Sequence, residues 1–235
     1  MNLVLLLQDD LISECRARIT GRRLEHVLNV HRAKVGGSLA VGLLNGKIGQ
    51  GHIVALTEQA LEMDVCLYDD PPPKLPLTLI VALPRPKVLN RLIAAATSMG
   101  VARIVLLNAW KVEKSYWKSP RLNMDNLLHH QMLGLEQAKD TVLPELCLAR
   151  FFAPFVRDEL PKLALQTQCL VAHPQASAPC PSGLNGPCTL ALGPEGGFIP
   201  NELDALEGIG FQPVNLGRRI LRTETALAAL VGKLY

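Results

Sequence analysis

Several features that mark common protein classes are missing from this 235-residue sequence. Charged residues make up 19% of it and hydrophobic residues 49%, a balance that excludes a disordered chain and allows a packed core. No apolar run approaches the roughly 20 residues that span a bilayer. The opening residues, MNLVLLLQDD, lack the basic segment and the small-residue cleavage site of a signal peptide and are typical of a first strand. We therefore expect a cytoplasmic protein with no membrane partner.

The sequence also lacks the clustered ligands of a metal site or a disulfide framework. At this length and in the expected compartment, scattered cysteines without a Cys-x-x-Cys pair are typical of free thiols. The histidines His26, His31, His129 and His130 do not stand at metal-ligand spacing from other ligands. We expect no bound metal and no disulfide among Cys15, Cys66, Cys147, Cys169, Cys180 and Cys188.

Acidic residues are absent between Pro71 and Val112, and basic residues also outnumber acids between Glu14 and Lys34. Segregated positive charge is typical of proteins that bind a polyanion, most simply nucleic acid. The alternative is a set of solvated charges that fold onto unrelated faces. Under the first interpretation, the candidate RNA contacts are Arg16, Arg18, Arg22, Arg23, Arg32, Arg85, Lys87 and Arg91.

Two regions with different patterns of predicted secondary structure flank a proline-rich stretch. Residues 1–70 are predicted to form a small β-barrel with one short helix at 24–30, and Asn45-Gly46 is a strong hairpin signal. Residues 71–76, which include three consecutive prolines, predict a stiff linker. The expected strands of the first region are 3–7, 38–44, 47–58 and 61–68.

From residue 77 to 235, apolar strands alternate with amphipathic helices. This alternation predicts an α/β domain with a mostly parallel sheet. Ligands of such sheets bind beyond the carboxyl ends of the strands. The expected strands are 77–83, 103–107, 146–151, 169–174, 188–193 and 214–217, and the expected helices are 86–100, 124–140, one between 151 and 169, one from 201, and one from 223 to the end.

Two of these strand ends carry unusual loops, LALGPEGGF at 190–198 and LGRRILRTETA at 216–226. The glycines allow positive φ or close approach of a ligand. The first loop lacks the Lys-Ser/Thr of a P-loop and the spacing of GxGxxG, and its acid, Glu195, is a poor neighbour for phosphate. A cationic or neutral ligand fits it better, and the two loops are expected to border one pocket.

GPEGGF and LGRRILRTETA resemble the paired motifs of the SPOUT methyltransferases, and more narrowly of the RsmE family, which methylates N3 of a uridine in 16S ribosomal RNA. Supporting segments are SMGVARIVLL (98–107) and LEQAKDTVLPEL (135–146). The resemblance implies an N-terminal PUA-like barrel, a trefoil knot in the C-terminal domain, a homodimer, and S-adenosyl-L-methionine as cofactor. It also implies the small ribosomal subunit as partner.

Transferred by motif, the implied cofactor-binding residues are Leu192, Gly193, Pro194, Glu195, Gly196, Gly197, Leu216, Gly217, Ile220, Leu221, Thr223 and Thr225. Uracil N3 is protonated at neutral pH, so its methylation needs a base or contacts that favour the anion. Arg222 is the candidate to hold a carbonyl oxygen or a phosphate. Glu195 and Glu224 are both candidates for the base, and Glu224 is equally explained as a first-turn helix carboxylate.

The chain departs from the family pattern where the family often carries charge, at Ala95, Ser98 and Asp140. These departures bear more on the RNA target than on the cofactor. The alternatives are therefore a SPOUT methyltransferase acting on another RNA such as tRNA, a non-catalytic RNA-binding assembly factor, and an unrelated nucleotide-dependent α/β enzyme. The intact loops argue against the second, and the missing phosphate motifs argue against the third.

Overall fold

The computed structural model describes residues 2–235 and contains two compact units. The first consists of residues 2–73 together with Gln131–Leu143, and the second of Lys74–His130 and Pro144–Tyr235. Residue 1, which the predicted first domain includes, lies outside the described residues. The first junction between the units, Pro73–Lys74, falls in the proline-rich stretch. Nothing in the sequence predicted that residues 131–143 belong to the first unit.

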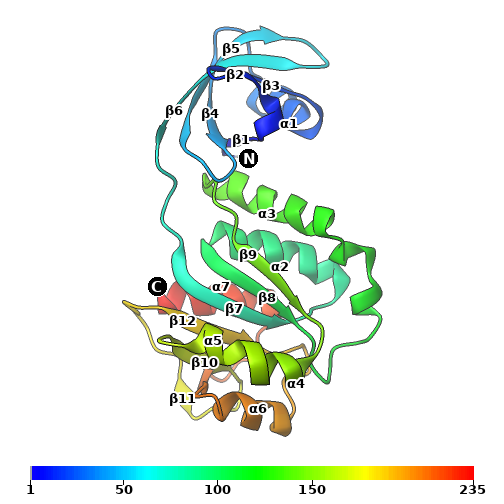
Figure 1. Cartoon of the computed structure of the whole chain (residues 1–235), viewed down its shortest axis with the longest axis vertical. Coiled ribbons are helices and arrows are strands. Elements are labelled where there is room, and N and C mark those ends of the chain that lie inside the picture. The colour runs from blue at the N-terminus through cyan, green and yellow to red at the C-terminus, as the bar shows by residue number, and fades with distance from the viewer. Residues whose placement is uncertain (1) are drawn as a thin grey trace. The chain divides into compact units, whose positions relative to one another are not determined.

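The first unit is built on a six-stranded sheet (Figure 1). The four predicted strands are confirmed, and β4 and β5 form the antiparallel pair expected around Asn45-Gly46. The predicted helix is also present, as α1 (Gly21–His26) and a π-helical turn (Val27–His31). Two further strands, β2 and β3, were not predicted, because they are too short to show alternation. In spatial order the strands are β1 (Val4–Leu6), β4 (Ser38–Leu43), β5 (Ile48–Leu56), β6 (Leu61–Asp69), β3 (Arg16–Ile19) and β2 (Leu11–Ser13).

The returning segment closes the first unit with apolar and polar contacts. It includes the end of α3 (Met124–Ala138), where Leu135 is buried in one cluster with Leu3 and Leu5. The Asn45 N–H donates to the Thr141 carbonyl at 2.8 Å. Buried Asp140, one of the departures from the family pattern, accepts the Thr141 and Val142 N–H groups. Asp140 therefore shapes the chain here.

The second unit contains a seven-stranded sheet in which every pair is parallel, as predicted. All five residues of β12 are buried between β7 and β10. A near-continuous apolar strand is typical of a sheet covered on both faces. In spatial order the strands are β11 (Ala178–Pro179), β13 (Gln212–Asn215), β10 (Gln168–Ala172), β12 (Cys188–Leu192), β7 (Leu75–Ala82), β8 (Val101–Leu107) and β9 (Glu145–Ala149).

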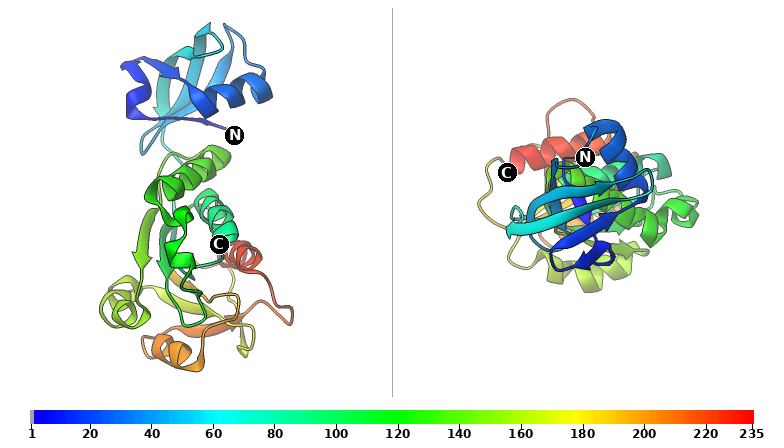
Figure 2. Two further views of the ribbon diagram at one scale, coloured as in Figure 1. Left: turned by 90° about the vertical axis from the view of Figure 1, so that its right-hand side faces the viewer. Right: turned by 90° about the horizontal axis from the view of Figure 1, so that it is seen from above.

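Helices cover both faces of this sheet (Figures 1 and 2). On one face α2 (Pro86–Ser98) packs against α7 (Thr223–Leu234). The other face carries α4 (Phe152–Pro154), α5 (Leu160–Ala164) and α6 (Pro200–Glu207). The predicted helices are thus confirmed, with the one between 151 and 169 broken by a π-helical turn at Phe155–Glu159.

Some negative findings hold for residues 2–235. No helix there is long and apolar enough to cross a membrane. The described His, Cys, Asp and Glu side chains form no group of three that could hold a metal ion. The six cysteines are free thiols, and burial raises the pKa of Cys188 to about 12, which keeps that thiol protonated.

The first unit contains an ion pair whose carboxylate is buried, and this pair provides a test. Arg22 Nη1 and Nη2 donate to the two Glu136 oxygens at 2.9 and 2.8 Å, and the Glu136 side chain is only 2% exposed. We expect Arg22→Met to destabilise the unit by about 3 kcal/mol, because it leaves a buried charge without its partner. The matched control is Arg16→Met, which removes an exposed pair with Asp64 and should cost less than about 1 kcal/mol.

Hydrogen exchange of peptides from β4, β5 and β6 would measure both effects within the first unit, with β7 and β8 peptides as the internal reference. Equal protection in the two variants would contradict a structural role for Arg22.

Candidate functional site

A cavity lies at the carboxyl ends of three strands in the second unit, β13, β10 and β12. It encloses about 750 Å³ of empty space, part of it open to solvent. Both loops singled out in the sequence border it, as expected, and the end of β10 lies between them. No motif at the end of β10 had marked that strand as part of the site. The residues that line the cavity are Ala172–Pro174, Leu192–Glu195, Gly197, Val214–Gly217, Arg219–Leu221, Thr223, Ala226 and Leu230.

The loop after β12 is a tight turn. The Gly197 N–H donates to the Pro194 carbonyl at 2.7 Å, and Gly197 has a φ of 71°, which an L-residue adopts only with strain. Gly193 allows a close approach, because a Cβ there would lie 3.1 Å from the Phe198 nitrogen. The turn leaves Glu195 at its exposed corner, with its side chain 40% accessible.

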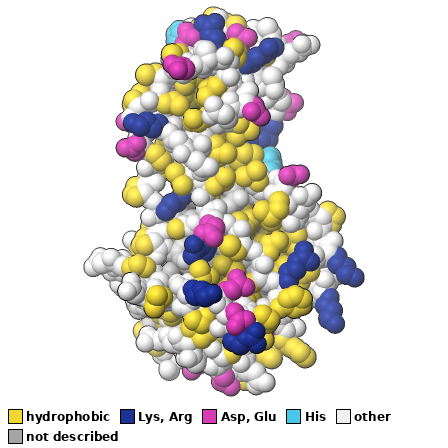
Figure 3. Space-filling model, in the orientation of Figure 1, with side chains coloured by type: hydrophobic (Ala, Val, Ile, Leu, Met, Phe, Trp, Pro, Cys, Tyr) yellow, Lys and Arg dark blue, Asp and Glu magenta, His cyan; other side chains and the backbone are white. Residues whose placement is uncertain are grey.

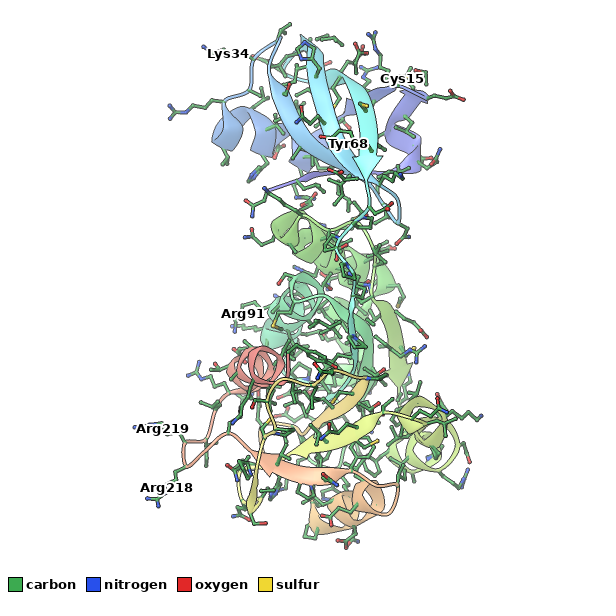
Figure 4. All side chains as sticks on the ribbon, turned by 90° about the vertical axis from the view of Figure 1, so that its left-hand side faces the viewer. Cys15, Lys34, Tyr68, Arg91, Arg218 and Arg219 are labelled. Carbon is green, nitrogen blue, oxygen red and sulfur yellow. The ribbon has the colours of Figure 1, made fainter. Side chains whose placement is uncertain are left out.

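The loop after β13 is held by one side chain, Asn215. Its Nδ2 donates to the Ala176 and Ala178 carbonyls at 2.7 and 3.0 Å, and its Oδ1 accepts the Gly217 N–H at 2.8 Å. Asn215 thus joins the segment after β10 to the segment after β13, which form two walls of the cavity. Beyond this anchor, Arg218 and Arg219 project from the loop (Figure 4).

A second hollow, the acceptor cleft, lies at the ends of β12, β7 and β8. It has about 700 Å³ of empty space, again partly open to solvent, and is lined by Leu83, Pro84, Arg85, Lys111, Val112, Glu113, Tyr116, Pro194, Glu195 and Gly196. Arg85 Nε lies 2.7 Å from Glu195 Oε2, and Lys111 Nζ donates to the Gly196 carbonyl at 2.7 Å. Two cations from different strand ends therefore contact the β12 loop.

Ionisation in the acceptor cleft follows from these contacts. The Glu195 carboxylate, and then the Tyr116 hydroxyl, raise the pKa of Arg85 above its usual value, so the guanidinium stays charged. Burial, followed by the Glu113 carboxylate, raises the pKa of Tyr116 above its usual value. The Tyr116 hydroxyl is therefore protonated at neutral pH and donates to Glu113 at 3.1 Å.

The segment that carries Lys111 and Tyr116 is anchored by a residue that the sequence did not reveal. Glu202, buried at the start of α6, accepts the Trp110 N–H at 2.7 Å and the Ile199 N–H at 3.0 Å. Trp117 is held in turn by its Nε1 donating to Asn108 at 2.8 Å. These contacts fix the loop after β8 against the rest of the second unit.

The structure divides the predicted site residues into two groups. Ten of the twelve predicted cofactor contacts line the cavity, whereas Gly196 lines the acceptor cleft and Thr225 lines neither. Arg222 is exposed at the start of α7 and is not a wall residue. Glu224 also lies outside both hollows and pairs with Arg91 at 3.2 Å. Of the candidate catalytic groups, Glu195 is the one that the structure brings into the hollows.

Most of the predicted RNA contacts have carboxylate partners. Arg16 pairs with Asp64 and Arg18 with Glu62, while Arg23 binds Asp10 and the Leu5 carbonyl. Within residues 2–235, no carboxylate lies at ion-pair distance from exposed Arg32 or Lys87. Figure 3 shows Lys and Arg side chains gathered at the edge where Figure 1 draws the segment between β8 and α3.

Comparison with known proteins connects this geometry to a family. Residues 71–234 match the model of the RNA methyltransferase domain. The ribosomal RNA small subunit methyltransferase E of Treponema pallidum is 30% identical, over 97% of this chain and 88% of its own. The protein of the same name from Synechocystis is 26% identical, over 94% and 73%.

Two solved structures share the fold. Ribosomal RNA small subunit methyltransferase E of Neisseria gonorrhoeae, bound to S-adenosyl methionine, has a TM-score of 0.75 at 21% identity and covers 98% of this chain and 95% of its own. A methyltransferase of Legionella pneumophila in complex with the same molecule has a TM-score of 0.71 at 23% identity, with 98% and 95% covered. The resemblance read from the two loops is therefore confirmed, and the chain belongs to the RNA methyltransferase domain family, within its RsmE branch.

Proposed function

We propose that this protein uses S-adenosyl-L-methionine to methylate N3 of a uridine in the 16S ribosomal RNA of the small subunit. The observation that carries this proposal is the cavity at the ends of β13, β10 and β12, bordered by both family loops. Relatives named ribosomal RNA small subunit methyltransferase E support the choice of RNA.

The cavity suits the cofactor in its chemistry. Apolar side chains such as Leu192, Leu216 and Leu230 offer a surface for a flat adenine ring. Gly193 and Gly197 present backbone without side chains, and the Glu195 carboxylate suits a cation. When bound, S-adenosylmethionine supplies a methyl group on a sulfonium sulfur. A carboxylate and free backbone groups fit that molecule better than a phosphate-binding loop would.

The acceptor must lose its N3 proton to become a nucleophile. Glu195 is the group best placed to take it, because this carboxylate lines both hollows. Of the two roles considered for Arg222, contact with a phosphate suits its exposed position at the start of α7. Arg218 and Arg219, which project from the same loop, suit that task as well (Figure 4).

Family membership extends the proposal to features of architecture. We expect the first unit to act as a PUA-like RNA-binding barrel and the second to contain the trefoil knot of SPOUT enzymes. We also expect a homodimer in the cytoplasm, where the ribosomal substrate is found. Knot formation is a rare exception to the unthreaded connections of most proteins.

The hydrogen bonds of Asn215, which hold two wall segments of the cavity together, provide a test of cofactor binding. We expect Asn215→Ala to raise the Kd for S-adenosylmethionine about tenfold, because it removes two hydrogen bonds that join the wall segments and a third that holds the Gly217 turn. Isothermal titration calorimetry measures the change. The matched control is Asn126→Ala, which removes two amide hydrogen bonds, to Asn90 and Arg121, away from the cavity. An equal loss of affinity in both variants would count against the assigned cavity.

Methyl transfer tests the reaction and the base together. Small subunits from cells lacking this modification are incubated with labelled S-adenosylmethionine, and the product is identified by nucleoside mass spectrometry. We expect 3-methyluridine with the wild type, and a kcat at least about 10²-fold lower with Glu195→Gln. Higher pH should partly restore that variant, since hydroxide then removes the N3 proton.

Glu224→Gln is the matched control and should retain most activity. The reverse pattern would assign the base to Glu224. Wild-type protein that binds the cofactor but transfers nothing to small subunits would favour another RNA, and tRNA would be tried next.

A further inference from the structure

The loop after β12 is a partition between the cavity and the acceptor cleft. Pro194 and Glu195 line both hollows. The strand order explains this, because β12 lies between β10 on one side and β7 on the other. The cavity is completed by β10 and β13, and the acceptor cleft by β7 and β8. The two hollows therefore adjoin at Pro194 and Glu195.

The acceptor cleft contains both donors and acceptors of hydrogen bonds. Arg85 and Lys111 can only donate, whereas the carboxylates of Glu195 and Glu113 can only accept. Arg85 and Glu195 are in direct contact at 2.7 Å, and Lys111 reaches the neighbouring Gly196 carbonyl at 2.7 Å. The cleft thus offers two cationic donors close to the Glu195 carboxylate.

The Watson–Crick edge of uracil has the complementary pattern, with N3–H between the O2 and O4 acceptors. Cytosine presents an acceptor at N3 and a donor at N4, so it would face Glu195 with the wrong group. Sites that read a base by hydrogen bonds to its edge reject the wrong base, because the polar groups that the base covers are then left unpaired.

We propose that the acceptor cleft binds the target uracil, with Glu195 accepting from N3–H and with Arg85 and Lys111 donating to its two carbonyl oxygens. This inference rests on the proposed function and deepens it by naming the residues that select the base. Entry of the base replaces the direct Arg85–Glu195 contact by hydrogen bonds to the base edge. In the proton transfer, the N3 proton moves to Glu195 and its electron pair stays on N3, where Arg85 and Lys111 stabilise the negative charge spread over O2 and O4.

Aromatic and basic residues around the cleft suit single-stranded RNA. The Tyr116 ring is part of the cleft wall, and the Trp110 side chain is 79% exposed on the same loop. Exposed aromatic rings and nearby cations form the stacking surfaces and phosphate contacts of RNA-binding proteins. The exposed cations Lys114, Lys118 and Arg121 follow on the same segment.

Variants of the two cations provide the first test. We expect Arg85→Met and Lys111→Met each to lower kcat/KM for small-subunit methylation about 10²-fold. The Kd for S-adenosylmethionine should change less than about threefold, which also shows that the variants are folded. Arg85→Lys, which keeps a donor, should recover part of the loss. The control Arg157→Met removes an exposed pair with Asp158 elsewhere in the unit and should leave both quantities unchanged.

Cross-linking provides a second test that does not depend on turnover. The full-length protein is irradiated with 4-thiouridine 5′-monophosphate, and the modified peptides are mapped by mass spectrometry. We expect adducts within 110–116 or 194–196, suppressed by excess uridine monophosphate but not by cytidine monophosphate.

The outcomes separate this inference from the proposed function. Wild-type rates for both methionine variants, or adducts confined to other segments, would overturn the assignment of the cleft while the methyltransferase activity stands. A wild-type protein that forms no 3-methyluridine would overturn the proposed function and this inference with it.

Discussion

The burial of β12 is the constraint on which the site depends. With β7 on one side, β10 on the other and helices over both faces, all five of its residues are buried. A strand in this position can contribute chemistry only where it ends. The polar groups available to a ligand therefore come from the Pro194–Gly197 turn, and the same turn has to serve the hollows on both of its sides.

The sequence predicted the parts of the fold that have a local signal. Apolar runs and helical periodicity located nearly every strand and helix of the second unit, because burial on both faces or on one stripe leaves a clear pattern. The glycines of the two loops marked the cavity for the same local reason. Very short elements such as β2, β3 and β11 carry too few residues to show any pattern.

The contacts that build the site could not be predicted, because each of them joins residues that are far apart in the sequence. Arg85 meets Glu195 across 110 positions of sequence, and Glu202 reaches Trp110 across 92. Charge segregation was likewise an ambiguous signal in the first unit. Arg22 and Arg23 belong to a basic stretch, yet the acids that neutralise them, Glu136 and Asp10, come from outside it. Charge counted along a chain does not reveal which cations are left for a partner.

The return of Gln131–Leu143 to the first unit has a consequence for synthesis on the ribosome. Domains usually fold as they emerge, beginning with the N-terminal one. Here Leu3 and Leu5 pack against Leu135, and the Asn45 N–H donates to the Thr141 carbonyl. These contacts can form only after residues 135–141 have been synthesised. More than half of the chain must be translated before the first unit has all its parts. Neither unit corresponds to a single continuous stretch of the message, so a cut at the prolines would yield two incomplete pieces and not two domains.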